Sequence, residues 1–307
     1  MKHAGQRPRP PARTARSARL AAGLAVVLWA GLPTPGLAQD GATLKSVFAA
    51  QQDRLAHNPF GRPLFINSKE TSGQLQGEVY SVVEHPYAMV SQALRPAANW
   101  CDILMLHLNV KGCRTSGAAA TTRLWLAVGK KHNQPLEDAY QLDFSFRVNA
   151  DAGDYLQVQL NADEGPLGTR DYRIRLEAVP IDARRTFVHM SYSYGYGMAA
   201  RMALQAYLAT LGRDKVGFSV TGRRPDGRPT HVGGVLGVVE RNTMRYYLAI
   251  DAFLATYSLP PAEQPERRIH QWHASTERYA MQLREMTQAE YIEMKRKEIR
   301  RQKAEAR

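Results

Sequence analysis

The sequence predicts an α+β fold in which a curved antiparallel β-sheet grips a long helix near the C-terminus. Two observations predict it. Apolar and polar residues alternate with a period of two over successive segments between residues 124 and 194, which is typical of strands with one buried and one wet face. Residues 234–257 carry a broad apolar stripe at helical spacing. A one-sided sheet needs a cover, and this helix is the natural candidate.

The N-terminus predicts export. The first nineteen residues contain six Lys or Arg and no acid, and the apolar run Leu20–Leu32 that follows is too short to span a bilayer comfortably. Gly36-Leu37-Ala38 supplies small residues at a cleavage site. We therefore expect residues 1–38 to be a signal peptide cleaved after Ala38, and the mature chain to be periplasmic in a Gram-negative bacterium. An uncleaved anchor is the alternative.

The charge and the cysteine content limit which partners and which cysteine sites can be expected. The formal net charge is +13, but the signal segment carries six of the basic residues and the C-terminal tail carries many more, so the basic balance gives little reason to expect a nucleic-acid partner. Cys101 and Cys113 are the two cysteines, and in an oxidising compartment we expect them to form a disulfide. A zinc site would need further ligands at a familiar spacing, which the sequence lacks.

Elements can be placed along the mature chain. A lead-in helix and linker occupy residues 39–62, and the turn residues 71–73 predict a hairpin between two extended runs. A short helix follows His85-Pro86, and Cys101 leads into a further extended run. The extended segments are 64–70, 75–83, 103–110, 124–128, 140–148, 156–160, 172–178 and 188–194.

The second half of the chain is mainly helical. A helix is expected over Met198–Leu211, then a strand over Val216–Thr221, then the long helix. Residues 267–286 have helical character, and the capping box Thr287–Glu290 opens a final helix dense in Lys and Arg. The composition changes at Pro260, so residues 260–307 are interpreted as a charged helical extension.

This order of elements resembles the START-like superfamily, also called SRPBCC or helix-grip proteins. The residues that carry the resemblance are Gly77–Val90, Leu94–Trp100 and the helix around Val239–Phe253, and the domain is assigned to residues 63–259. Two features depart from the pattern. The helix at 198–211 is interpreted as an insertion before the last strand, and the charged helices after Pro260 as an appendage.

The resemblance implies a hydrophobic cavity between sheet and long helix, which superfamily members use to hold lipids, sterols or polyketides. It implies no catalytic residues. We expect no cofactor. A solid core is the alternative. The residues expected to line the cavity are Tyr140, Phe144, Phe146, Met190, Tyr192, Tyr194, Tyr247 and Phe253.

Binding of a lipid-like ligand without chemical change is thus the expected function. One alternative is an envelope interaction protein acting through its C-terminal helices. The other is a cyclase or aromatase type of enzyme that uses a polar residue such as His189 or Tyr194 inside the cavity.

Three further motifs have ordinary explanations. Gly195–Ala200 spells G-x-G-x-x-A, but a dinucleotide site needs a parallel sheet, so a tight strand-to-helix turn is expected. His270 and His273 could hold a metal only with a third ligand, and we expect none. The basic residues of 287–307 could contact anionic lipid or an envelope protein, although a solvated charged helix is the usual case; they are Lys295, Arg296, Lys297, Arg300, Arg301, Lys303 and Arg307.

Overall fold

The computed structural model describes residues 40–305 except 119–120, 152 and 211. The predicted signal peptide, residues 1–38, lies outside the described residues. Among the helices that are described, none is both long and apolar enough to cross a membrane.

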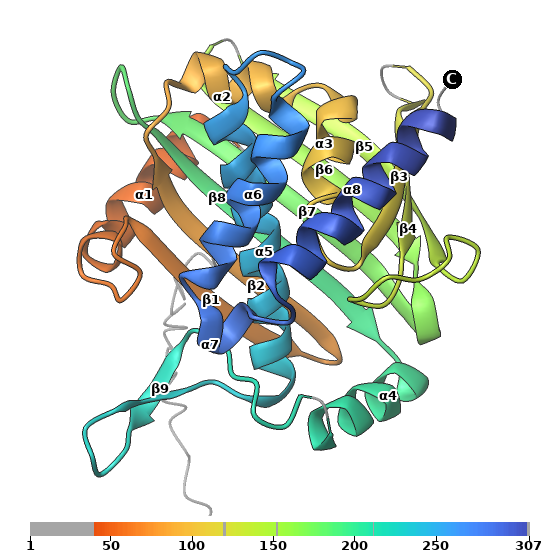
Figure 1. The fold of residues 1–307 in the computed structure, drawn as a ribbon. Coiled ribbons are helices and arrows are strands. Elements are labelled where there is room, and N and C mark those ends of the chain that lie inside the picture. The colour runs from red at the N-terminus through yellow and green to blue at the C-terminus, as the bar shows by residue number, and fades with distance from the viewer. Residues whose placement is uncertain (1–39, 119–120, 152, 211, 306–307) are drawn as a thin grey trace, which may run out of the picture. The chain divides into compact units, whose positions relative to one another are not determined.

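Eight antiparallel strands form one large sheet, shown in Figure 1, in the order β1-β2-β8-β7-β6-β5-β4-β3. The hairpin β1–β2 starts one edge, the chain crosses to β3 at the other edge, and successive hairpins return to β8 beside β2. The predicted meander is confirmed. The strands are β1 (Leu64–Thr71), β2 (Gln74–Val83), β3 (Val110–Ser116), β4 (Arg123–Val128), β5 (Tyr140–Asp151), β6 (Tyr155–Glu164), β7 (Thr169–Pro180) and β8 (Thr186–Tyr196).

Helices pack on both faces of this sheet. The predicted long helix is α5, which lies on the inner face against β1, β2 and β8, whereas α1 packs on the outer face in a smaller apolar cluster. In Figure 1, α6 and α8 lie in front of α5 and the sheet. The helices are α1 (Gly41–Ala56), α2 (Tyr87–Leu94), α3 (Ala97–Leu104), α4 (Met198–Ala209), α5 (Gly234–Thr256), α6 (Gln264–Glu277), α7 (Ala280–Leu283) and α8 (Gln288–Glu305).

The contact between α5 and β2 depends on a glycine. A Cβ built at Gly77 would lie 2.2 Å from Oγ1 of Thr243 and 3.4 Å from the carbonyl oxygen of Val239. The Thr243 hydroxyl cannot swing away freely, because it donates to that same Val239 carbonyl at 2.8 Å. Gly77 therefore sets how closely α5 approaches the sheet.

Gly77→Ala should lower the free energy of unfolding by about 1–3 kcal/mol, the usual cost of overpacking a filled interface. Chemical denaturation of the purified variant measures it. Thr243→Ala should recover part of the loss in the double mutant, because it removes the hydroxyl that the new methyl group meets. Gly222→Ala is the control, since nothing lies within 4 Å of a Cβ at Gly222. Equal losses at the two glycines would contradict this account.

The expected strand at 103–110 is wrong in its first part. Helix α3 continues to Leu104, turns follow, and β3 begins only at Val110. The run is apolar throughout, and periodicity cannot separate a short buried helix from a buried strand in such a run. The disulfide between Cys101 and Cys113 is present, with a Cα–Cα distance of 5.3 Å, and it joins α3 to β3.

The expected strand at 216–221 also differs from the structure. The amides of Phe218 and Ser219 donate to the carboxylate of Glu240 on α5, at 2.6 and 2.9 Å, so they are not available to a neighbouring strand. A short hairpin follows, formed by β9 (Val220–Arg223) and β10 (Pro229–His231) outside the main sheet. Helix α4 therefore follows the last strand of the sheet instead of preceding it.

The helices after Pro260 belong to the main body of the protein. Tyr291 and Met294 of α8 and Trp272 of α6 lie in the same apolar core as the sheet and α5. The capping box is confirmed, because the Thr287 amide and hydroxyl donate to Glu290 and the Glu290 amide donates back to Thr287. The interpretation of these helices as an appendage is wrong, since their apolar residues complete the core.

Candidate functional site

A cavity of about 640 Å³ opens between α4, the first half of α5 and the inner face of the sheet. We call it the aromatic cavity. Strands β4, β5, β7 and β8 supply one wall, and Ala200, Ala203, Leu204 and Tyr207 of α4 supply another. A volume of this size is in the range of small-molecule sites, which are concave and mainly apolar.

Six rings line one side of the aromatic cavity in a continuous row. His107 stacks on Tyr246 with ring centres 4.6 Å apart, and Tyr246 lies 5.1 Å from Tyr192. The row continues through Tyr194, Tyr172 and Phe144, with neighbouring centres 5.4–6.4 Å apart beyond Tyr194. Such spacings are those of favourable aromatic pairs. The wall is therefore well packed on its sheet side and offers ring faces and edges to the cavity.

Three phenols in this wall have no protein partner. Among the described residues, nothing forms a hydrogen bond with the hydroxyl of Tyr192, Tyr194 or Tyr246, although Tyr192 and Tyr194 are only 6 % and 8 % exposed. Burial raises the pKa of all three hydroxyls, so each keeps its proton. None of the three oxygens is among the fully enclosed side-chain atoms that lack a partner, so each hydroxyl is open to the cavity. A molecule in the cavity can therefore form hydrogen bonds with them.

The residues predicted to line a cavity fall into two groups. Tyr140, Phe144, Tyr192 and Tyr194 line the aromatic cavity, with Tyr140 half exposed at its mouth. The other four lie elsewhere. Phe146 packs against Trp100, and Met190 is fully buried in the core; Tyr247 bonds Ser81 at 2.6 Å, and Phe253 lies under Arg268. The interior is thus solid at one end of the sheet and hollow at the other.

Sequence reasoning missed part of the wall. Tyr172 shares the inward face of its strand with Ile174, a signal that alternation alone gives. Tyr246 could not be chosen over its neighbour Tyr247 without knowing how α5 is rotated on the sheet. His107 lies in a turn, where no periodic pattern applies.

His107 is held as a neutral ring. Its Nδ1 accepts a hydrogen bond from the Asn109 amide at 3.1 Å, which leaves the proton on Nε2. Burial, followed by the positive charges of Arg245 and Lys295, lowers its pKa well below the usual value. The ring therefore acts as an uncharged member of the aromatic wall.

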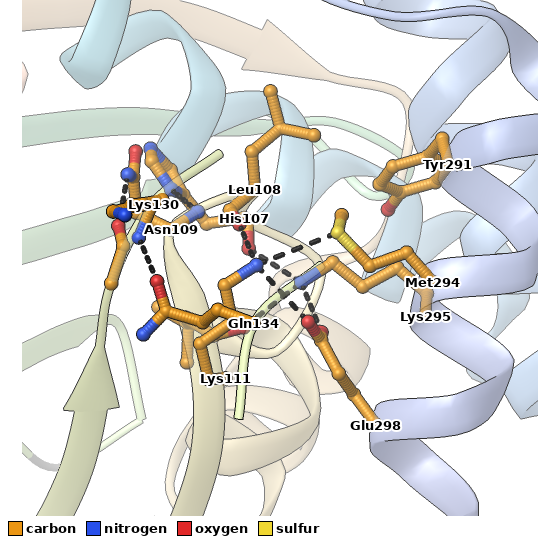
Figure 2. A network of polar contacts seen from close by, with 12 residues as sticks. His107, Leu108, Asn109, Lys111, Lys130, Gln134, Tyr291, Met294, Lys295 and Glu298 are labelled. Carbon is orange, nitrogen blue, oxygen red and sulfur yellow. Dashed lines mark hydrogen bonds and ion pairs between the residues drawn. The ribbon is translucent and has the colours of Figure 1, made fainter. Parts of the chain in front are cut away.

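A buried charge cluster fixes the turn that carries His107 (Figure 2). Lys295 of α8 donates to the carbonyls of His107 and Val110 and to Glu298, at 2.7–2.9 Å. Lys111 donates to the Leu108 carbonyl at 2.9 Å and to the other oxygen of Glu298 at 3.1 Å. Lys111, Lys295 and Glu298 are at most 3 % exposed. One carboxylate thus balances two buried ammonium groups.

Glu298→Gln should lower the free energy of unfolding by about 3–5 kcal/mol at pH 7, because it leaves two buried cations without a counter-ion. Chemical denaturation at pH 7 measures the loss. Glu293→Gln, on the exposed side of the same helix, is the matched control and should change little. A loss no larger than that of the control would contradict a role for Glu298 in balancing this cluster.

The loss in Glu298→Gln should shrink as the pH rises from 8 to 10. Burial lowers the pKa of Lys295 to about 8, against an ordinary value of 10.5. Between these two pH values Lys295 is protonated in the unfolded chain but neutral in the folded chain, so raising the pH favours the folded protein. A neutral Lys295 needs no counter-ion, so the stabilities of wild type and variant become more alike. A deficit that grows with pH would contradict the burial of a charged Lys295.

His189 does not enter the cavity, which corrects the enzyme alternative that placed it there. His189 faces the outer side of the sheet, stacked on Tyr80 with ring centres 4.5 Å apart. Its Nδ1 lies 3.2 Å from Glu177, and its Nε2 lies 3.7 Å from Glu78. Burial acts to lower the pKa of this ring, but the two carboxylates outweigh it and raise the pKa above the usual value. Of the two residues that the enzyme alternative named, His189 and Tyr194, Tyr194 is the one that lines the aromatic cavity.

The other motifs have structural roles. Strand β8 is antiparallel to both neighbours, so the glycines at 195 and 197 form a strand-to-helix turn and not a dinucleotide site. His270 pairs with Glu266 at 3.0 Å, whereas His273 is buried beside Tyr291. Across the described part of the chain, no group of three His, Cys, Asp or Glu is placed to hold a metal.

Some basic residues of the C-terminal tail form contacts within the folded protein. Lys295 is buried, Arg296 pairs with Glu266, and Arg301 donates to the Lys111 carbonyl. Lys297, Arg300 and Lys303 are exposed, while Arg307 lies outside the described residues.

A second groove, of about 990 Å³, lies beside the start of α8 and is lined by both basic and acidic side chains. It shares Asn109, Lys130 and Tyr207 with the aromatic cavity.

Several solved structures are similar to the chain at low identity. Human StAR-related lipid transfer protein 5 is 10 % identical, with 71 % of this chain and 97 % of that one covered and a TM-score of 0.35. The Zhui aromatase/cyclase from Streptomyces sp. R1128 is 14 % identical, covering 64 % and 96 %, with a TM-score of 0.36. A StAR-related lipid transfer protein fragment from Xanthomonas axonopodis is 17 % identical, covering 48 % and 86 %, with a TM-score of 0.33.

No protein-family model and no curated protein sequence matches the chain. The fold assignment rests on the chain's own architecture, in which a hairpin and two short helices precede a six-strand meander and a long helix on its inner face. The fold is of the helix-grip type. Within this arrangement, the aromatic cavity lies between the sheet, α4 and the first half of α5.

Proposed function

We propose that the protein binds a hydrophobic small molecule or lipid in the aromatic cavity and does not change it chemically. The observation that carries the proposal is a cavity of about 640 Å³ with a largely apolar and aromatic lining, to which phenol hydroxyls are open. Transfer of apolar surface from water into such a site stabilises a complex by roughly 25 cal/mol per Å² before the costs of association.

Ala203→Trp should weaken binding of the neutral fluorophore N-phenyl-1-naphthylamine at least tenfold, because Ala203 lines the cavity and an indole would fill part of it. Fluorescence titration of the purified, solvent-extracted protein measures the affinity. Ala206→Trp is the matched control, one turn along the same helix on an exposed position that does not line the cavity. Unaltered binding in Ala203→Trp, or equal losses in both variants, would place the fluorophore elsewhere.

We also propose that binding takes place in the periplasm. The support is the basic, then apolar, then small-residue order of residues 1–38, and the disulfide Cys101–Cys113 suits an oxidising compartment. Contact of the exposed basic residues of α8 with an envelope protein or anionic lipid remains a subsidiary proposal, to which Lys295 does not contribute.

When the full chain is expressed with its own N-terminus in a Gram-negative host, the osmotic-shock fraction should contain a protein that begins at Gln39. Intact-mass measurement before and after reduction should also show the disulfide as a gain of two hydrogens. Substituting charged residues into Leu20–Leu32 should keep the chain in the cytoplasm, unprocessed. Recovery of unprocessed wild-type chain in the membrane fraction would favour the uncleaved anchor.

A further inference from the structure

The inner wall of the aromatic cavity combines three free hydroxyls with an absence of charge. Tyr192, Tyr194 and Tyr246 come from neighbouring positions on β8 and α5, and their rings are in mutual contact through Tyr192. Tyr172 differs from them, because its hydroxyl already donates to Thr169 at 2.8 Å. The three free phenols therefore place hydroxyls on the aromatic part of the lining.

Charged side chains lie only at the mouth. Of the described residues that line the cavity, Lys130 and Asp138 are the charged ones, and both are exposed. The buried cations behind His107 do not line the cavity, and they pair with Glu285 or Glu298. Burial is the main cause that raises the pKa of each of the three phenols, and neighbouring tyrosines add to it.

A ligand that fills this cavity must satisfy the phenols without burying a charge. A plain hydrocarbon would leave the hydroxyls unpaired, which costs free energy for each buried polar group. A carboxylate or phosphate would have to give up its hydration where no cation lines the wall. A neutral oxygen can accept from one phenol and, as a hydroxyl, donate to another.

We propose that the ligand is a neutral, oxygen-bearing apolar molecule whose hydroxyl or carbonyl oxygen is bound by Tyr192, Tyr194 and Tyr246. The ligand enters with this oxygen foremost, and its other end lies toward the mouth beside Lys130. This inference rests on the proposed binding function and specifies its ligand class.

Three twelve-carbon probes that differ only at one end test the inference. Dodecane, 1-dodecanol and dodecanoate each compete with N-phenyl-1-naphthylamine for the solvent-extracted protein at pH 7.5. The alcohol should displace the fluorophore with at least a threefold lower inhibition constant than either of the others. Tightest binding of the carboxylate would overturn the proposal, and so would equal binding of alkane and alcohol.

Phenol variants assign the effect to the patch. Tyr192→Phe and Tyr194→Phe should each weaken binding of 1-dodecanol about threefold to tenfold, as expected for one lost hydrogen bond between neutral groups. They should leave dodecane unchanged, because the ring remains. Tyr257→Phe, at a tyrosine outside the cavity, is the control. Equal losses for alcohol and alkane would show a packing defect and overturn the assignment.

Failure of this inference can be told apart from failure of the proposed function. If the fluorophore binds and responds to Ala203→Trp but the alcohol has no advantage, the cavity binds apolar molecules by area alone, and only the inference is wrong. If the fluorophore does not bind the extracted protein, both are wrong.

Discussion

The eight-stranded sheet presents one apolar face that must be kept from water, and α5 packs on the part formed by β1, β2 and β8. The other helices cover the rest of this apolar face unevenly. At one end α3, α6 and α8 fill the space with Trp100, Trp272 and Tyr291, all almost fully buried. At the other end α4 stands beyond the sheet, and rings line the gap without closing it. The interior is therefore solid where α3, α6 and α8 cover the sheet, and hollow beside α4.

Polar groups are treated differently at the two ends. In the filled end, Lys111 and Lys295 are each surrounded by acceptors, and Glu298 accepts from both. Buried charges are tolerated when every hydrogen-bonding position is satisfied. In the hollow end, the hydroxyls of Tyr192, Tyr194 and Tyr246 are open to the cavity. The charged cluster therefore stabilises the fold, whereas the phenols are accessible to a molecule in the cavity.

Local patterns predicted the strands well because a two-residue period directly reports which face is buried. The same reasoning placed Tyr192 and Tyr194 inward and identified α5, whose stripe is long enough to be unambiguous. It failed where long-range partners decide the conformation. The amides of Phe218 and Ser219 donate to the carboxylate of Glu240, which lies 21–22 residues later in the sequence. The turn at 105–109 depends on α8, and the choice between Tyr246 and Tyr247 depends on the rotation of a helix against a sheet.

The dependence of residues 106–111 on α8 has a consequence for how the protein folds. The Tyr291 hydroxyl donates to the Leu106 carbonyl, and Lys295 donates to those of His107 and Val110, across sequence separations of 185–188 residues. Contacts between residues so far apart in sequence are slow to form, because the long intervening loop must close first. The edge of the sheet at β3 therefore gains its final cover through one of the least local contacts in the protein.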